Sequence, residues 1–162
     1  MVERRDIGSW LEGSPAEPVP AGAGLPAEGS GSPARFARRL AALAIDWVAC
    51  LLISSVFFRD PHAALPVVSG DPMATLGLFA LENVLLVGTL GHTVGHRLLG
   101  LRVRRVVVDK DGRPMPDEGR PPGLGRAAVR TLALCLVVPP AIQDGLGRGL
   151  HDRAAGTAIV RR

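Results

Sequence analysis

The sequence predicts an all-α membrane protein, a small transmembrane helical bundle of about three spans with a short cytoplasmic β-hairpin and a disordered N-terminus. Two observations carry this prediction. Hydrophobic residues make up 47% of the 162 residues and are concentrated in three runs, and Gly and Pro dominate the first 34 positions. A chain of this length holds one domain plus tails, and two Cys argue against a disulfide-rich secreted module.

The first 34 residues are expected to form a disordered tail. From Leu11 to Ala34, five Gly and five Pro fall in 24 positions. Such a segment cannot bury enough apolar surface to offset the entropy of ordering it. The opening residues contain Arg4 and Arg5 without an apolar stretch after them, so they do not read as a secretory signal peptide. The membrane domain is therefore assigned to residues 35–162.

Three apolar runs follow, at residues 40–58, 73–90 and 127–142. A helix needs roughly 20 apolar residues to cross a bilayer, with a working range of about 17–25. The first two runs meet this requirement and are apolar around the whole circumference, unlike the surface helices of a soluble bundle. The third run is short, contains Arg130, and has Pro139-Pro140 near its end. We expect three spans, with a re-entrant third segment as the alternative.

The distribution of basic residues predicts the orientation. The 91–126 connection carries eight basic and four acidic residues, whereas the 59–72 connection has one Arg. Under the positive-inside rule, the N-terminus and the 91–126 loop lie in the cytoplasm. The tail, 143–162, is also basic. It lies outside if the third segment spans the membrane and in the cytoplasm if that segment returns, and the sequence leaves both open.

The basic 91–126 loop is expected to contain a β-hairpin from about Leu101 to Met115, turning at Asp109–Gly112. Residues 156–161 would supply a third strand only if the tail is cytoplasmic. Basic segments beside a membrane contact anionic lipid head groups. Because the loop has no aromatic residue, we expect no nucleic-acid partner.

Single ionisable residues interrupt the apolar runs: Asp46, Glu82 and Arg130. A charge at mid-helix costs about 2.5–3.5 kcal/mol on insertion scales, so such residues usually face protein or water and pair with one another. We expect a contact between Arg130 and either Asp46 or Glu82. Two roles stay open for these residues, a proton or cation relay and a structural ion pair.

No catalytic or metal site is predicted. His92 and His96 are four residues apart, but no Cys, Asp or Glu lies close to them in sequence. The chain has no recognisable Ser/His/Asp set and no phosphate-binding loop. We therefore expect neither an enzyme nor a cofactor.

Three segments in order, 39–46, 91–103 and 150–157, resemble the motifs of the RDD family of bacterial membrane proteins. The arginine and two aspartates that name the family fall on Arg39, Asp46 and Asp152. The loop motif matches Gly91, Thr93, Gly95, His96, Arg97 and Gly100, and the C-terminal motif matches His151, Asp152, Gly156 and Thr157. One departure is His96, because the family usually has Lys there.

The resemblance implies a multi-pass protein of the bacterial plasma membrane. The family is largely uncharacterised, although transport has been proposed for it and some members are linked to sodium–proton exchange. We therefore expect proton- or cation-coupled transport of ions or small ligands. Three spans cannot enclose an aqueous path, so a homo-oligomer or a partner membrane protein is implied. The alternative is a non-catalytic adaptor with a basic cytoplasmic face. Asp152 is expected to pair with Arg39 or with Arg97.

Overall fold

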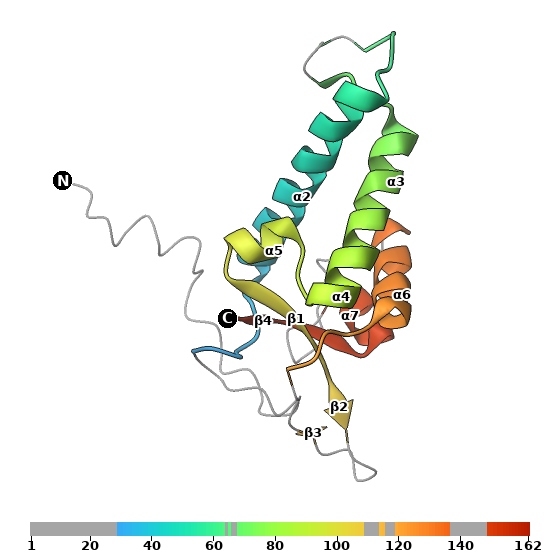
Figure 1. The fold of residues 1–162 in the computed structure, drawn as a ribbon. Helices are drawn as coiled ribbons and strands as arrows, with labels where there is room; N and C mark the ends of the chain where they lie inside the picture. The colour runs from blue at the N-terminus through green and yellow to red at the C-terminus, as the bar shows by residue number, and fades with distance from the viewer. Residues whose placement is uncertain (1–28, 64, 66–67, 109–113, 116–118, 137–148) are drawn as a thin grey trace, which may run out of the picture.

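The computed structural model describes residues 29–63, 65, 68–108, 114–115, 119–136 and 149–162. Two long helical segments run side by side as a hairpin (Figure 1). The first is α2, Phe36–Phe57, and the second is a continuous segment from Pro72 to Leu90. Both are long and apolar enough to cross a membrane, which agrees with the predicted runs 40–58 and 73–90.

The second segment comprises α3 (Pro72–Glu82), the π-helical turn η2 (Asn83–Val87) and α4 (Gly88–Leu90). Its start is defined by Asp71, whose carboxylate accepts a hydrogen bond from the Ala74 amide at 2.7 Å, with Pro72 in the first turn. Its end is defined by Gly91 in the left-handed conformation, with φ of 75°. Local capping residues therefore fix both ends of this segment.

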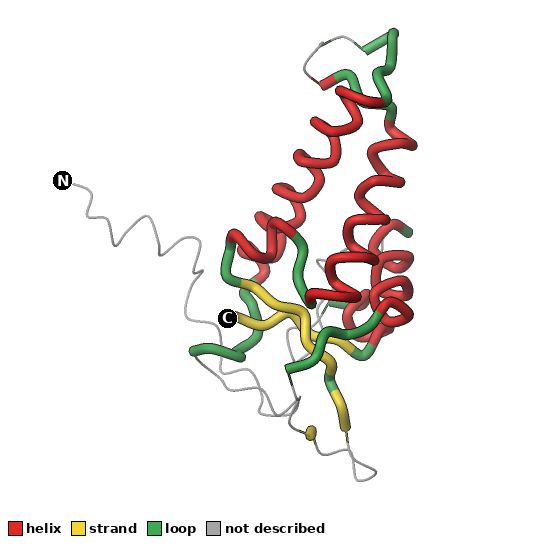
Figure 2. Tube along the Cα trace, viewed as in Figure 1, coloured by secondary structure: helices red, strands yellow, loops and turns green. Residues whose placement is uncertain are grey.

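The remaining elements gather at one end of the helical hairpin, opposite the 58–71 connection (Figure 2). In chain order they are α5 (Val94–Leu98), β1 (Leu101–Arg105), β2 (Val107–Val108), β3 (Pro114–Met115), α6 (Leu124–Cys135), α7 (Leu150–Ala155) and β4 (Thr157–Arg161). The apolar core at this end joins β1, α6 and β4 to α2, to the residue Ala34 before it, and to η2: Ala34, Ala42, Val87, Leu101, Val103, Ala127 and Ile159.

Strand β4 lies at the centre of the small sheet region. It pairs antiparallel with β1, from Leu101 opposite Arg161 to Arg105 opposite Thr157. On its other side it forms a bridge to Pro33, and the Ala34 amide donates to the Ile159 carbonyl at 2.9 Å. The chain's last strand therefore lies at the same end of the hairpin as the start of α2.

Two sequence-based expectations need correction here, and a third is tested only in part. The described part of the third run lies in α6 (Leu124–Cys135) and its C-cap Leu136, and α6 is not among the described helices long enough to span a membrane. The rest of that run lies outside the described residues. The proposed hairpin is divided: β1 pairs with β4, while β2 pairs with β3, from Val107 opposite Met115 to Val108 opposite Pro114. Residues 31–34, assigned to the disordered tail, hydrogen-bond to β4.

Other expectations fall on residues that the structure leaves undescribed. These are the disorder of residues 1–28, the turn at 109–112 and the break at Pro139-Pro140. The predicted all-α class is close to the result, which is mostly helical with a two-stranded antiparallel sheet β1–β4 and the short β2–β3 ladder.

Candidate functional site: a charged cavity beneath α6

Asp46 joins α2 to the N-terminus of α5. Its side chain is 1% exposed. One carboxylate oxygen accepts from the Gly95 amide at 2.6 Å, and the other accepts from the Thr93 hydroxyl at 2.5 Å. Thr93 also caps α5, because its hydroxyl accepts from the His96 amide at 3.2 Å. Both oxygens of Asp46 are therefore used to hold the loop motif against α2.

Gly95 makes this arrangement sterically feasible. A Cβ atom built on Gly95 would overlap the Ala42 carbonyl and lie 3.0 Å from the Asp46 Oδ1 atom. Since the Ala42 carbonyl belongs to the α2 backbone, it cannot move aside as a side chain would. Gly95 therefore allows the backbone of α5 to approach α2 closely enough for its amide to reach Asp46.

Asp152, at 0% exposure, is the centre of a second cluster. The Arg130 Nε atom donates to its Oδ1 at 2.8 Å, and the Thr157 hydroxyl contacts the same oxygen at 3.1 Å. The second oxygen lies 3.9 Å from Arg39 Nη1 and 3.5 Å from His151 Nε2. One carboxylate thus connects α2, α6, α7 and the start of β4.

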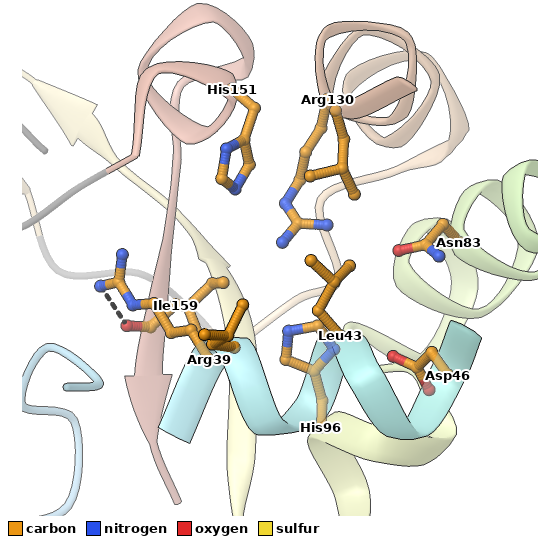
Figure 3. Close-up of a pocket in the computed structure, with 10 residues that line it drawn as sticks. Arg39, Leu43, Asp46, Asn83, His96, Arg130, His151 and Ile159 are labelled. Carbon is orange, nitrogen blue, oxygen red and sulfur yellow. Dashed lines mark hydrogen bonds between the residues drawn. The ribbon is translucent and has the colours of Figure 1, made fainter. Parts of the chain in front are cut away.

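A cavity of about 30 Å³ lies between the two clusters. Figure 3 shows the Arg130 guanidinium extending into it from α6, with the His96 ring facing it from α5. The polar lining consists of Arg39, Asp46, Asn83, His96, Arg130 and His151, and the apolar lining consists of Leu40, Leu43, Leu134 and Ile159. This volume accommodates one or two water-sized groups, since one water needs roughly 10–15 Å³.

The two histidines of the cavity are held neutral. Burial, reinforced by the Arg130 charge, lowers the pKa of His96 to about 3. Burial also lowers the pKa of His151 to about 4, although the neighbouring Asp152 acts in the opposite direction. Burial alone would raise the pKa of Asp152, but Arg130, His151 and Arg39 outweigh it and lower that pKa.

The hydrogen bonds of Thr93 indicate which nitrogen of His96 carries the proton. The Thr93 hydroxyl has one proton and donates it to the Asp46 carboxylate. Its oxygen also lies 2.5 Å from His96 Nδ1, so Nδ1 must be the donor in that contact. In the neutral ring, Nε2 is therefore the nitrogen with the lone pair.

Glu82 lies outside the Asp152 cluster, but close to Asp46 and to the Val94 amide at the start of α5. It accepts a hydrogen bond from the Cys50 thiol at 3.2 Å, between α2 and the last residue of α3. Its other carboxylate oxygen is buried and has no hydrogen-bond partner among the described residues. The sequence singled out Glu82 but not Cys50, because two residues 32 positions apart are paired only by the register of the hairpin.

The structure brings together most of the residues that the sequence selected. Arg39, Asp46, Arg130 and Asp152 all belong to the two clusters, but Arg130 pairs with Asp152, so the expected contact with Asp46 or Glu82 was wrong. Asp152 contacts Arg39 and not the exposed Arg97. The motif glycines have backbone roles: Gly91, Gly100 and Gly156 take positive φ angles of 75°, 64° and 62°.

Asn83 is a cavity residue that the sequence did not assign to a site. It lies 2% exposed in η2, and its amide nitrogen donates to the Phe79 carbonyl at 3.0 Å. The sequence feature that could have identified Asn83 is its position next to Glu82 in an otherwise apolar run. Within the described part of the chain, no group of three or more His, Cys, Asp or Glu side chains could hold a metal ion.

Comparison with known proteins does not extend this description. No protein-family model matches the chain, and no curated protein or solved structure is detectably similar to it.

Proposed function

We propose that the chain is an integral membrane protein of the RDD type, with α2 and the Pro72–Leu90 segment crossing the bilayer. Support comes from their surfaces, because only 28% of the apolar window in each is buried. The core helix of a soluble protein would be mostly buried. Large apolar side chains remain exposed along both segments, among them Trp47, Val48, Leu52, Ile53, Val56, Phe57, Met73, Leu81 and Leu85.

Helix α6 supports partial insertion of the third apolar segment. Beside Ala127 it buries Arg130 and Thr131, and it exposes Leu124, Val129 and Leu132, whereas a surface helix of a soluble protein buries its large apolar side chains. Its 12 residues give a length of about 18 Å, short of the hydrocarbon thickness of about 30 Å. We infer two full spans, with α6 packed beside the second and its apolar face toward lipid.

The basic end of the hairpin supports a cytoplasmic location for both ends of the described chain. Exposed arginines gather in the elements at this end: Arg35, Arg97, Arg120, Arg126, Arg153 and Arg162. The opposite connection, 58–71, carries Arg59 together with Asp60 and Asp71. Under the positive-inside rule the basic end faces the cytoplasm of a bacterial cell, where it contacts anionic lipid head groups.

The activity that we propose is transport of a small ion or ligand coupled to a proton or cation, carried by Glu82. The supporting observation is the unpartnered, buried oxygen of Glu82 in the middle of an apolar helical segment. A carboxylate in this position can bind a proton or cation reversibly. Asp46 is less suited, since both of its oxygens hold Thr93 and Gly95. Two spans cannot enclose a path, so the active form is an oligomer.

The test is flux in vesicles reconstituted with the purified protein. A pH gradient or a sodium gradient is imposed, and a dye trapped in the vesicles reports the internal pH. We expect wild-type protein and Glu82→Asp to dissipate the gradient, and Glu82→Gln to lose at least about tenfold in rate because it cannot release a proton. Unfolding is monitored separately through Trp47 fluorescence. Folded wild-type protein without flux, or full flux in Glu82→Gln, contradicts the proposal.

A second candidate function is that of a non-catalytic membrane adaptor. It is favoured by the ion pairs that Asp152 forms with Arg39 and Arg130, because such pairs suit a structural role. In that case the exposed arginines at the basic end would receive the partner. Removing residues 1–28, which leaves the backbone bonds of residues 31–34 intact, would then abolish the cellular phenotype. Under the transport proposal the same truncation keeps the vesicle flux, so the two functions are separable.

A further inference from the structure

We propose that the cavity beneath α6 binds a small monovalent anion of halide size, held by the Arg130 guanidinium and accompanied by a proton on His96. This site goes beyond the transport proposal and does not require Glu82 to carry an ion. It rests on four observations: an unpartnered guanidinium nitrogen, a cavity-lining carboxylate whose two oxygens are both hydrogen-bonded, a small and partly apolar cavity, and a neutral histidine facing the arginine.

Arg130 supplies the donor. The residue is 3% exposed, and its Nε atom is bonded to Asp152. Its Nη1 atom is buried and has no hydrogen-bond partner in the described part of the chain. Figure 3 shows the guanidinium extending into the cavity, away from the helix that carries it. A buried charged donor without an acceptor is unfavourable, so an acceptor bound in the cavity would stabilise it.

The nearby carboxylates do not supply that acceptor. Asp46, the carboxylate that lines the cavity, already accepts from Gly95 and Thr93. Asp152 lies outside the lining. Its Oδ1 atom accepts from Arg130 Nε and Thr157, and its Oδ2 atom, which has no hydrogen bond among the described residues, lies 3.9 Å from Arg39 Nη1 and 3.5 Å from His151 Nε2. A bound cation would need oxygen ligands, yet the unsatisfied cavity group of Arg130 is a donor. The chemistry of the lining therefore favours an anion over a cation.

Cavity size selects the anion. A volume of about 30 Å³ holds a halide or about two waters, which favours a small anion. Part of the wall is apolar, formed by Leu40, Leu43, Leu134 and Ile159. A halide tolerates such a wall better than a polyatomic oxyanion, because it needs fewer hydrogen bonds when it leaves water.

His96 makes the binding depend on pH. Its ring lines the cavity together with the Arg130 guanidinium, and in the neutral form its Nε2 lone pair would repel an anion. The positive charge of Arg130 disfavours protonation of the His96 ring. An anion bound between the guanidinium and the ring would offset that charge and favour protonation of the ring. The other charged or titratable groups around the ring are Arg39 and Asp46 on α2, His92 before α5, and His151 and Asp152 on α7.

The experiment measures thermal unfolding of the full-length protein in detergent, through tryptophan fluorescence in a Trp10→Phe background that leaves Trp47, with potassium bromide replacing potassium gluconate at constant ionic strength. We expect bromide to raise the unfolding temperature, with an apparent affinity that rises up to about tenfold per pH unit between pH 7.5 and 5, since one proton is taken up with the anion. Potassium sulfate should not reproduce the effect. No bromide effect at either pH, or an equal effect of sulfate, overturns the proposal.

Three variants locate the site. Leu134→Phe fills the cavity without removing a charge, and should abolish the bromide effect while the Arg130–Asp152 contact remains. His96→Lys places a permanent cation at the same point, and should retain bromide binding without its pH dependence. His96→Gln cannot take up a proton, and should bind bromide weakly at both pH values. An unchanged, pH-dependent bromide effect in Leu134→Phe would show that bromide binds elsewhere. Because the assay needs no flux, its outcome is independent of the Glu82 experiment.

Discussion

At the scale of single residues, the members of the charge cluster and the contact of Asp152 with Arg39 were predicted, but the partner of Arg130 was not. Arg39, Asp46 and Asp152 were selected through their motifs, and Arg130 through its position in an apolar run. The partner of Arg130 could not be derived from sequence, because it depends on how α7 docks against α6. A 22-residue separation in sequence carries no information about that docking. Asp152 was assigned to a tail and instead lies fully buried.

The neutral histidines predict a loss of stability in acid. The folded pKa values of His96 and His151 lie near 3 and 4, below the ordinary histidine value of 6.5. At neutral pH both are uncharged in the folded and unfolded states and contribute no pH dependence. Below about pH 6.5 the unfolded chain takes up protons that the folded protein does not, so stability falls by up to about 1.4 kcal/mol per histidine per pH unit.

The measurement is the midpoint of chemical unfolding in halide-free buffer between pH 7.5 and 4.5. His96→Gln and His151→Gln should each remove about half of the slope, since each deletes one titrating group. A wild-type midpoint that stays constant over this range contradicts the assignment of neutral, buried rings. Asp152 affects stability at lower pH than the histidines do. Because folding lowers its pKa, its ionised form stabilises the folded protein above about pH 4, and this stabilisation is lost as the pH falls further.

At the scale of elements, the long helices could be predicted and the small ones could not. The apolar runs 40–58 and 73–90 correspond to Phe36–Phe57 and Pro72–Leu90, because a long apolar stretch has few alternatives to a helix. The π-helical turn at Asn83–Val87 has no periodic signature. A strand at residues 156–161 was predicted only on the condition that the 143–162 tail lies on the same side of the membrane as the 91–126 loop. The β1–β4 pairing could therefore not be predicted from the sequence alone.

The α2–α5 contact offers a matched pair of glycine substitutions. Gly95→Ala would place a methyl group against the Ala42 carbonyl of α2 and separate the Gly95 amide from Asp46. We expect this variant to lose about 1–3 kcal/mol of stability, as overpacking typically does. Gly77→Ala in α3 is the control, because a Cβ there meets no atom within 4 Å and alanine favours a helix.

Both variants are compared by unfolding in the same detergent. The expected result is a lower midpoint for Gly95→Ala and an unchanged or slightly higher midpoint for Gly77→Ala. If Gly95→Ala were as stable as wild type, the close approach of the two backbones would not be needed, and the role given to Asp46 would fail with it.

At the scale of the whole molecule, the sheet region bears on the membrane topology that we propose. Strand β4 lies between β1 and residues 31–34, so the start of α2, the loop after the second long segment and the last strand share one end of the hairpin. A third full span would carry the C-terminus to the opposite side of the bilayer and separate β4 from both partners. If the long segments cross a membrane as we propose, an even number of crossings is compatible with these backbone bonds.

Cysteine accessibility in intact cells tests this topology directly. In a background with Cys50 and Cys135 replaced by Ala, Arg162→Cys places a thiol at an exposed residue after β4, and His62→Cys places one in the opposite connection. A membrane-impermeant maleimide should label His62→Cys in intact cells but label Arg162→Cys only after permeabilisation. The reverse pattern would keep two spans and invert the charge-based orientation. Labelling of both sites from outside requires an odd number of crossings, and in that case the β1–β4 pairing cannot form.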